Sequence, residues 1–375
     1  FSRAGVAKSL IARSVFGIFD NANTFAIQLT KGTPEEALTG PLNFRLLKEG
    51  QFVHLTDGYL PEADFAFLDE LFDGNDVALR SLLGMLHERR FEKGRQALNV
   101  PLLSSIATTN YLRESEVTEA VLDRFPFRST ILPSDNPYDQ LRIDLLYEQQ
   151  GGKPILIPKT MKVDIEEMRF LCDVVEGLDP KHRIKAPPAV LFFKNALIDL
   201  YLKIRAEEAK NVGAQEPYLS PRTLAKLRDV LNASALRDGR DTVSAADLKA
   251  LYYAAPTIGQ SNEENAFRSA YREIAKSLTQ SSFQEVQRLY TIHRALEGLL
   301  ADPSKRPELP LTWIETIKNL LHISSISEIT CDRLIAAAKP IGNKTDKSEY
   351  VARFREGLVR RIAMSKKAIE RHAQS

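Results

Sequence analysis

Several features that define particular protein classes are scarce or missing in this chain of 375 residues. Its two cysteines, Cys172 and Cys331, lie far apart and outside any CxxC pair, so neither a disulfide framework nor a zinc site is expected. No apolar run reaches the length of about 18 residues that a membrane-spanning helix needs, and the first residues lack the apolar core of a signal peptide. These absences favour a cytoplasmic protein without a membrane span.

A strong net charge is also missing. Lys and Arg together number 51, against 49 Asp and Glu, which gives a formal net charge of +2. A general nucleic-acid coat needs a large basic excess to neutralise phosphates, so nucleic acid is not expected as a partner. The six histidines form no HExxH pattern and no serine lies in a GxSxG elbow, so zinc-hydrolase and serine-hydrolase chemistry have no support.

The first third of the chain alternates short apolar runs with amphipathic stretches. The runs at 25–29, 65–68 and 102–108 are bounded by Gly, Pro, Asp or Asn and predict strands. Residues 77–90 and 115–125 place apolar side chains at helical spacing and predict helices between them. This alternation predicts an α/β layer with a mainly parallel sheet.

After residue 133 the pattern changes to long amphipathic helices. The clearest are predicted at 189–210, 221–238, 244–255, 283–300, 311–322 and 348–372. We therefore divide the chain into an α/β core at 1–150, a helical domain at 151–258 and a helical C-terminal segment at 259–375. Within the core, residues 52–56 and the glycines around them predict a hairpin insertion.

The most informative residues open the chain. The candidate phosphate-binding loop consists of Gly5, Val6, Ala7, Lys8, Ser9 and Leu10. Such a loop needs backbone N–H groups that point inward, a Lys for the outer phosphates and a hydroxyl for Mg²⁺. Lys8 and Ser9 fit the last two roles, but the octet at 2–9 has no Gly at its first or sixth position. By itself the match is equally consistent with an exposed Lys-Ser pair at a helix N-terminus.

Polar side chains follow two of the predicted strands. Asp69 and Glu70 come directly after the strand at 65–68, and Asn110 follows the strand at 102–108. Ligands of open parallel sheets bind at the carboxyl ends of the strands. There an Asp can join a Mg²⁺ shell, a Glu can polarise the attacking water, and an amide can orient that water. Each residue could also simply end a strand or begin a turn, but the conjunction with Lys8 and Ser9 favours a nucleotide site.

Taken in order, five motifs resemble those of the MoxR family of AAA+ ATPases. They are GVAKS at 5–9, ADFAFLDELFDGN at 63–75, LHERRF at 86–91, IATTN at 106–110 and AVLDRF at 120–125. The segment GYLPEA at 58–63 is especially similar to the RavA-like branch. The resemblance covers about residues 1–255. It implies an AAA+ P-loop NTPase core, an all-helical lid domain and a helical C-terminal segment.

The resemblance also implies roles for individual residues. Residues 5–10 become the Walker A loop, with Lys8 on the β and γ phosphates and Ser9 on Mg²⁺. Asp69 and Glu70 become the Walker B pair, for metal coordination and water activation. The remaining implied roles are sensor 1 for Asn110, a trans-acting arginine finger for Arg124, and sensor 2 for Arg222, which opens a helix after Ser220-Pro221.

The implied function is ATP binding and hydrolysis with Mg²⁺ by a ring, expected to be a hexamer, that remodels or activates protein partners. A von Willebrand A (vWA) domain protein is the expected companion. Two alternatives stay open, a catalytically impaired scaffold and a DNA-acting motor. The first is motivated by the departures in the loop and by Phe1 alone preceding the octet, where the family has a central strand, so an N-terminal truncation is expected.

Overall fold

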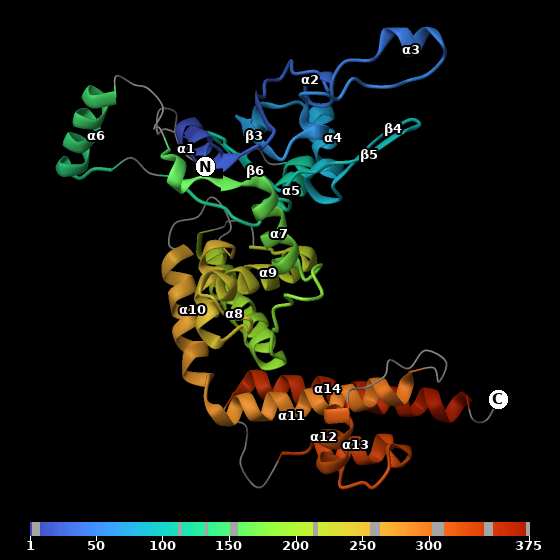
Figure 1. Ribbon diagram of the computed structural model, residues 1–375. Coiled ribbons are helices and arrows are strands. Elements are labelled where there is room, and N and C mark those ends of the chain that lie inside the picture. Colours follow the sequence, from blue (N-terminus) through green and yellow to red (C-terminus); the bar gives the residue numbers. More distant parts are fainter. Residues whose placement is uncertain are drawn as a thin grey trace. The chain divides into compact units, whose positions relative to one another are not determined.

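The computed structural model describes residues 1, 8–111, 115–131, 134–150, 157–212, 217–255, 263–301, 311–340 and 348–372 (Figure 1). The chain forms two compact units. The first comprises residues 1–184, 217–241 and 250–264, and the second comprises 185–216, 242–249 and 265–375. We describe each unit by itself.

A three-stranded parallel sheet forms the centre of the first unit. Its order is β2 (Thr24–Gln28), β3 (Phe65–Asp69) and β6 (Ser104–Ala107). The central strand β3 is buried from its first residue to Leu68 because both of its faces are covered: Ala66 and Leu68 lie in the core with α4, and Phe65 and Phe67 pack with α1. The predicted α/β class with a mainly parallel sheet is confirmed.

Shorter elements complete the first unit. Its other strands are the parallel pair β1 (Phe19–Asp20) and β7 (Val163–Asp164), and the antiparallel hairpin β4 (Arg90–Lys93) and β5 (Gln96–Asn99). Its helices are α1 (Lys8–Phe16), α2 (Glu36–Thr39), α3 (Phe44–Lys48), α4 (Asp76–His87), α5 (Glu116–Leu122), α6 (Pro137–Gln150), α7 (Ile165–Glu176) and α9 (Pro221–Arg237), with the 3₁₀ helices η1 (Leu60–Glu62), η2 (Leu71–Asp73) and η3 (Lys159–Met161).

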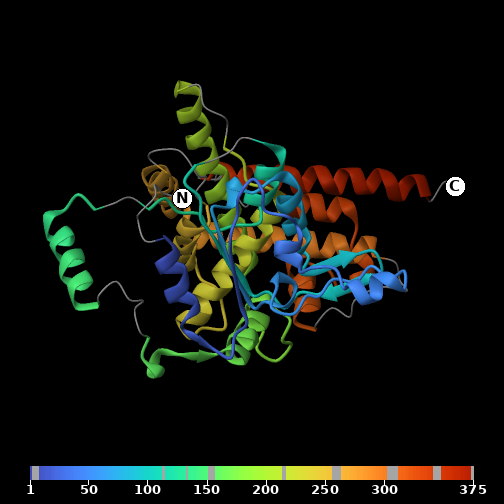
Figure 2. The same ribbon diagram turned by 90° about the horizontal axis from the view of Figure 1, so that it is seen from above.

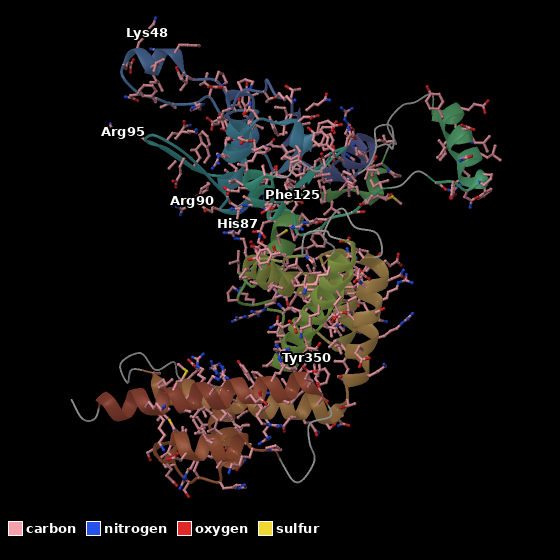
Figure 3. The ribbon with its side chains drawn as sticks, turned by 180° about the vertical axis from the view of Figure 1, so that it is seen from behind. Lys48, His87, Arg90, Arg95, Phe125 and Tyr350 are labelled. Carbon is pink, nitrogen blue, oxygen red and sulfur yellow. The ribbon has the colours of Figure 1, made fainter. Side chains whose placement is uncertain are left out.

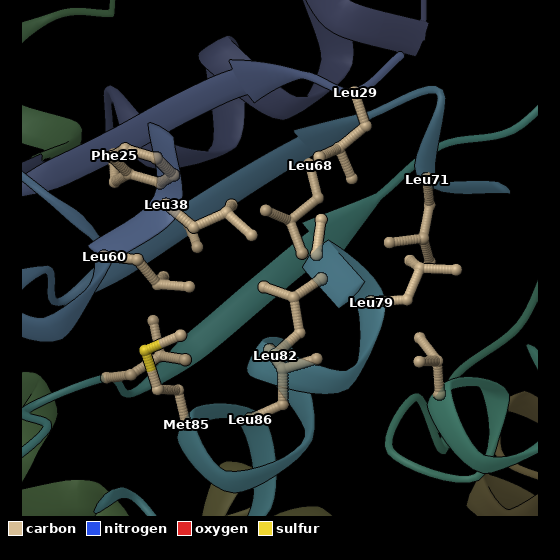
Figure 4. Close-up of a cluster of buried hydrophobic side chains, with 14 of the residues drawn as sticks. Phe25, Leu29, Leu38, Leu60, Leu68, Leu71, Leu79, Leu82, Met85 and Leu86 are labelled. Atoms are coloured by element: carbon tan, nitrogen blue, oxygen red, sulfur yellow. The ribbon is translucent and has the colours of Figure 1, made fainter. Parts of the chain in front are cut away.

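The core of the first unit lies between the sheet and α4. Leu79, Leu82 and Leu86 of α4 repeat at helical spacing and are buried with Leu29 and Leu68 from the sheet side (Figure 4). Each fully buried Leu contributes about 1.5–3 kcal/mol to folding. The packing of α4 on the sheet therefore holds the strand ends, and the polar residues that follow them, in place.

The predicted hairpin at 52–56 is present only as a single antiparallel bridge. The segment contains no strand, but Leu42 bridges His54, and the Asn43 N–H and the Leu55 N–H donate to the Val53 and Pro41 carbonyls, both at 2.8 Å. The backbone N–H of His54 donates to Gln96 Oε1 at 2.7 Å, and Gln96 Nε2 donates to the His54 carbonyl at 3.1 Å. A side chain of the β4–β5 hairpin thus satisfies both backbone groups of His54. Figure 3 shows Lys48 on α3 and Arg95 in the turn of the β4–β5 hairpin.

The second unit is helical. It contains α8 (Pro188–Val212), α11 (Gln280–Leu300), α12 (Leu311–Leu321), the 3₁₀ helix η5 (Ile326–Glu328), α13 (Cys331–Ala338) and α14 (Glu349–His372), while α10 (Glu263–Ser277) and the 3₁₀ helix η4 (Ala245–Tyr253) each have residues in both units. Helices α11 and α14 pack side by side (Figure 1), and the view from above shows α14 as one long helix (Figure 2). No helix within the described ranges combines the length and apolar character needed to cross a membrane.

The predicted division of the chain into domains at residues 150 and 258 stays a prediction. The two compact units of the structure have other boundaries. Helix α9 packs on α7, whereas α8 packs on α11. The two helices assigned together to the helical domain therefore belong to different units. Helix periodicity predicts that each helix has an apolar face, but it does not say which partner covers that face.

A buried ion pair ties α7 to the sheet. Asp64 stands immediately before β3 and is 3% exposed, and its carboxylate accepts hydrogen bonds from Arg169 Nη2 of α7 and, at 2.8 Å, from the Asn23 backbone N–H. Arg169→Ala should lower the free energy of unfolding by about 3 kcal/mol, because it leaves a buried carboxylate without its countercharge. Urea unfolding measures this loss. Glu166→Ala, which removes the exposed second partner of Arg169, should change stability by less than about 0.5 kcal/mol; equal losses in both variants would contradict the assignment.

Candidate functional site

The site begins where β3 ends. Asp69 is the last residue of β3, and Glu70 follows in the left-handed region with φ 51° and ψ 50°. A non-glycine residue in this region is uncommon and costs about 1 kcal/mol or more. The Leu71 N–H donates to the Thr108 carbonyl at 2.8 Å, and the Thr108 N–H donates to the Leu68 carbonyl at 3.0 Å. These bonds hold the chain after β3 against the chain after β6, which maintains the sharp turn at Glu70.

The carboxylate of Asp69 is held by three donors. Ser9, at the start of α1, donates from Oγ to Asp69 Oδ2 at 3.1 Å. Thr108 donates from Oγ1 to Asp69 Oδ1, and the Glu70 N–H approaches the same oxygen at 3.2 Å. The predicted metal-binding residues Ser9 and Asp69 therefore meet, with their oxygens facing each other.

Lys8, Glu70 and Asn110 form the other half of the cluster. Lys8 is buried, and its Nζ donates to Asn110 Oδ1 and lies 3.9 Å from Glu70 Oε1. Asn110 Nδ2 donates to the same Glu70 oxygen. The second oxygen, Glu70 Oε2, is buried and makes no hydrogen bond within the described residues. The five residues predicted from three separate segments thus converge, and one buried acceptor remains available to a ligand.

The structure describes the predicted loop from Lys8 onward. Gly5, Val6 and Ala7 lie outside the described residues, so their predicted contact with phosphates stays a prediction. Leu10 is described, and its side chain is exposed on α1. Any role of Leu10 would therefore come from its backbone at the helix start, where N–H groups are not used within the helix.

The two predicted arginines lie together at a different place. Arg124 follows α5 and donates from Nη1 to the Ala120 carbonyl at 2.7 Å, and Arg222 Nη1 at the start of α9 lies 3.4 Å from Asp123 Oδ2. Asp123 also accepts a hydrogen bond from Thr223 Oγ1 at 2.9 Å. Within the described residues, neither arginine has a hydrogen bond or ion pair with the cluster at the strand ends.

Positive charge dominates this second place. Burial raises the pKa of Asp123, but hydrogen bonds from Ser220 and Thr223 and the charges of the two arginines outweigh it, so the pKa lies below its usual value. Burial lowers the pKa of Arg124, and the charge of Arg222 lowers it further. Burial and the nearby cations also lower the pKa of His87 at the end of α4 (Figure 3). An added anion would therefore be attracted here.

Sequence reasoning missed Thr108 and Asp123. Thr108 lies two residues before Asn110 at the end of the same predicted strand, so its position at the site edge could have been inferred from the register. Asp123 directly precedes Arg124 in the sequence. Only the packing of α9 shows that its carboxylate also accepts hydrogen bonds from Arg222 and Thr223. Contacts between segments so far apart in the chain produce no regular spacing of residues from which they could be predicted.

The donor set fits Mg²⁺. Hydroxyl and carboxylate oxygens are the ligands that this ion prefers, and it usually binds through one or two protein groups with phosphates and waters. Ser9 and Asp69 supply such a pair. Among the described residues, no three His, Cys, Asp or Glu side chains gather as metal ligands, so further ligands would come from a nucleotide and water.

The beginning of the chain matches a known protein family. Residues 1–149 match the family model of the MoxR domain in the MoxR–vWA–β-propeller ternary systems. The first 149 residues are therefore similar to a MoxR domain. The cluster at the ends of β3 and β6 lies within the matched part.

Individual proteins also resemble the chain. Two uncharacterized proteins of Methanocaldococcus jannaschii are 36% identical over 48% of the chain and 31% identical over 66% of it. The matches span 49% and 60% of those proteins, so the chain covers about half to three-fifths of their length. A structural protein of the Acidianus two-tailed virus is 27% identical over 68% of the chain and 44% of its own length.

A solved structure shows the same fold. It is a protein of Cytophaga hutchinsonii described as a "putative ATPase", with a TM-score of 0.51 and 18% sequence identity. The match covers 74% of the present chain and 84% of that protein, so the likeness extends beyond residues 1–149 into the helical part. At this identity the match supports the architecture and not a shared activity.

Proposed function

We propose that the chain is an ATP-hydrolysing MoxR-type AAA+ subunit. The observation that carries this proposal is the cluster of Lys8, Ser9, Asp69, Glu70 and Asn110, in which the buried Glu70 Oε2 has no hydrogen bond within the described residues. A buried carboxylate oxygen without a donor is costly. A water molecule placed against a γ-phosphate would supply that donor.

Each residue has a chemical task in the proposed reaction. Bound Mg²⁺ would draw negative charge from the β and γ phosphates, with Ser9 and Asp69 as its protein ligands. Lys8 exchanges part of its contact with Glu70 for the outer phosphates. Asn110 holds Glu70 Oε1, so that Oε2 faces the attacking water and accepts its proton as the water oxygen bonds to phosphorus. The leaving group is ADP.

We also propose that hydrolysis requires assembly into a ring, expected to be a hexamer. Arg124 is proposed as the finger that reaches a neighbour's nucleotide. Arg222 is proposed to contact phosphates as sensor 2; it is 40% exposed, and the 3.4 Å contact with Asp123 is the single hydrogen bond of its guanidinium within the described residues. Arg222 can therefore exchange a weak protein contact for a phosphate at modest cost.

The work of the ring is proposed to be the remodelling or activation of a protein partner in the cytoplasm. A vWA-domain protein is the proposed companion, supported by the family match to MoxR domains of vWA-containing systems. Membership of the RavA-like branch stays a prediction, carried by the segment GYLPEA at 58–63.

Nucleotide binding tests the proposal most directly. The chain should bind a labelled ATP analogue in a Mg²⁺-dependent manner, and Lys8→Ala should weaken this binding by about 10- to 100-fold, because a hydrogen bond from a charged group contributes about 1.5–3 kcal/mol. Lys31→Ala, which removes an exposed Lys after β2, is the control. Equilibrium titration followed by fluorescence anisotropy measures both. Absence of Mg²⁺-dependent binding by the parent chain would favour the impaired scaffold instead.

A further inference from the structure

The side chain of Thr108 points into the site although it has no place in the proposed reaction. It is 6% exposed, and its Oγ1 donates to Asp69 Oδ1. Its backbone is paired on both sides, with its N–H on the Leu68 carbonyl and its carbonyl on the Leu71 N–H. Because a β-branched side chain has few χ1 states, this backbone pairing also fixes the direction of the hydroxyl.

The two oxygens of Asp69 consequently have different surroundings. Oδ1 receives the Thr108 hydroxyl and, at 3.2 Å, the Glu70 N–H, whereas Oδ2 receives the Ser9 hydroxyl. The terminal torsion of an Asp side chain is soft and would otherwise let the plane of the carboxylate rotate. The Thr108 hydroxyl holds the carboxylate in the plane in which its other oxygen faces Ser9.

We propose that Thr108 is a positioning residue that orients Asp69 for Mg²⁺, a role that rests on the proposed nucleotide site. Thr108 acts through Asp69, so it need not touch the metal or the nucleotide itself. Mg²⁺ demands near-ideal octahedral geometry, so a carboxylate that rotates binds it less well. Loss of a hydrogen bond that supports a metal ligand typically lowers metal affinity by about 10- to 100-fold.

The neighbouring Thr109 provides a matched control. It is 7% exposed, and its Oγ1 donates to the Tyr111 carbonyl at 2.7 Å and not to Asp69. Thr108→Val and Thr109→Val therefore remove the same buried hydroxyl from adjacent residues. A purely structural effect of losing a buried hydroxyl appears in both variants, whereas an effect on the orientation of Asp69 appears in the first alone.

The test is a Mg²⁺ titration of labelled ATP-analogue binding, monitored by fluorescence anisotropy without turnover. Thr108→Val should raise the Mg²⁺ concentration at half-saturation by about 10- to 100-fold. Thr108→Ser, which keeps the hydroxyl, and Thr109→Val should titrate close to the parent. Binding of the analogue in excess EDTA should be equal in all four proteins, because the role of Thr108 is exerted through the metal.

Thermal melting confirms that each variant is folded, and Thr108→Ala replaces Thr108→Val if the latter does not fold. An unchanged Mg²⁺ midpoint in the variant without the hydroxyl, with a parent that depends on Mg²⁺, would overturn the role of Thr108 and leave the proposed function standing. So would an equal shift in Thr109→Val. A parent chain whose nucleotide binding ignores Mg²⁺ would overturn the proposed function and this role together.

Discussion

Glu70→Gln should retain Mg²⁺-dependent ATP binding while turnover falls by about 10²- to 10⁴-fold, the contribution typical of a general base. The substitution keeps the shape of the side chain and an oxygen that can accept the hydrogen bond from Asn110 Nδ2. It removes the acceptor atom Oε2, which is buried and has no hydrogen-bond partner within the described residues. An amide nitrogen at that position cannot take a proton from water. Phosphate release under saturating ATP measures turnover, and analogue titration measures binding.

Asp73→Asn is the matched control for Glu70→Gln. Asp73 lies in η2 just beyond Glu70, and its carboxylate receives the Tyr111 hydroxyl at 2.5 Å, outside the cluster of Lys8 and Asn110. Its turnover should stay close to that of the parent. Unchanged turnover in Glu70→Gln would remove Glu70 from the mechanism.

The ATP-loaded Glu70→Gln protein is also the appropriate bait for a purified protein of the proposed vWA-domain class, because it should hold the nucleotide-bound state.

Arg124→Ala should abolish assembly-dependent hydrolysis, with a loss of about 10³- to 10⁵-fold in turnover. An arginine that reaches a neighbour's γ-phosphate stabilises charge that develops only in the transition state, so binding of ATP to the isolated subunit should be unaffected. The Arg124 guanidinium is suited to leave its present contacts for a neighbour's γ-phosphate. Its Nε is buried without a hydrogen bond within the described residues, and Nη1 is held by the Ala120 carbonyl alone apart from a 3.9 Å approach to Asp123.

Mixing two inactive variants distinguishes action in trans from action within one subunit. In a ring of head-to-tail interfaces, a 1:1 mixture of Glu70→Gln and Arg124→Ala should recover up to about a quarter of parental turnover, because some interfaces combine an intact Glu70 with an intact neighbouring Arg124. No recovery, or a parental rate per subunit that stays flat through the assembly range, would exclude the trans role. Arg90→Ala removes an exposed arginine after α4 and should leave turnover unchanged (Figure 3).

The residues of the candidate site could be predicted because parallel strands bring their carboxyl ends to one edge. The apolar run that ends in Asp69 and Glu70 predicts both a buried strand and acids at its end, and Asn110 follows the next parallel strand in the same way. Lys8 and Ser9 could be added from the chemistry of phosphate binding alone. In the structure these five residues lie together.

The contacts that depend on particular neighbours could not be predicted in the same way. The predicted hairpin at 52–56 forms only an antiparallel bridge between Leu42 and His54, and the backbone groups of His54 are paired with Gln96, more than forty residues later. The meeting of Arg222 with Asp123 likewise depends on the packing of α9 within the first unit. A helix in the sequence has an apolar face, but the residues that cover it come from elsewhere in the chain.

The sequence by itself determined the fold class and the candidate residues of the site, because strand burial, helix periodicity and the Lys-Ser, Asp-Glu and Asn motifs are local patterns. Only the tertiary structure decided how those groups are held. It placed Thr108 against Asp69, turned Glu70 into the left-handed region and gathered both arginines around Asp123. The physical reason is that orientation is set by hydrogen bonds between segments distant in the chain, and such bonds leave no periodic signal along it.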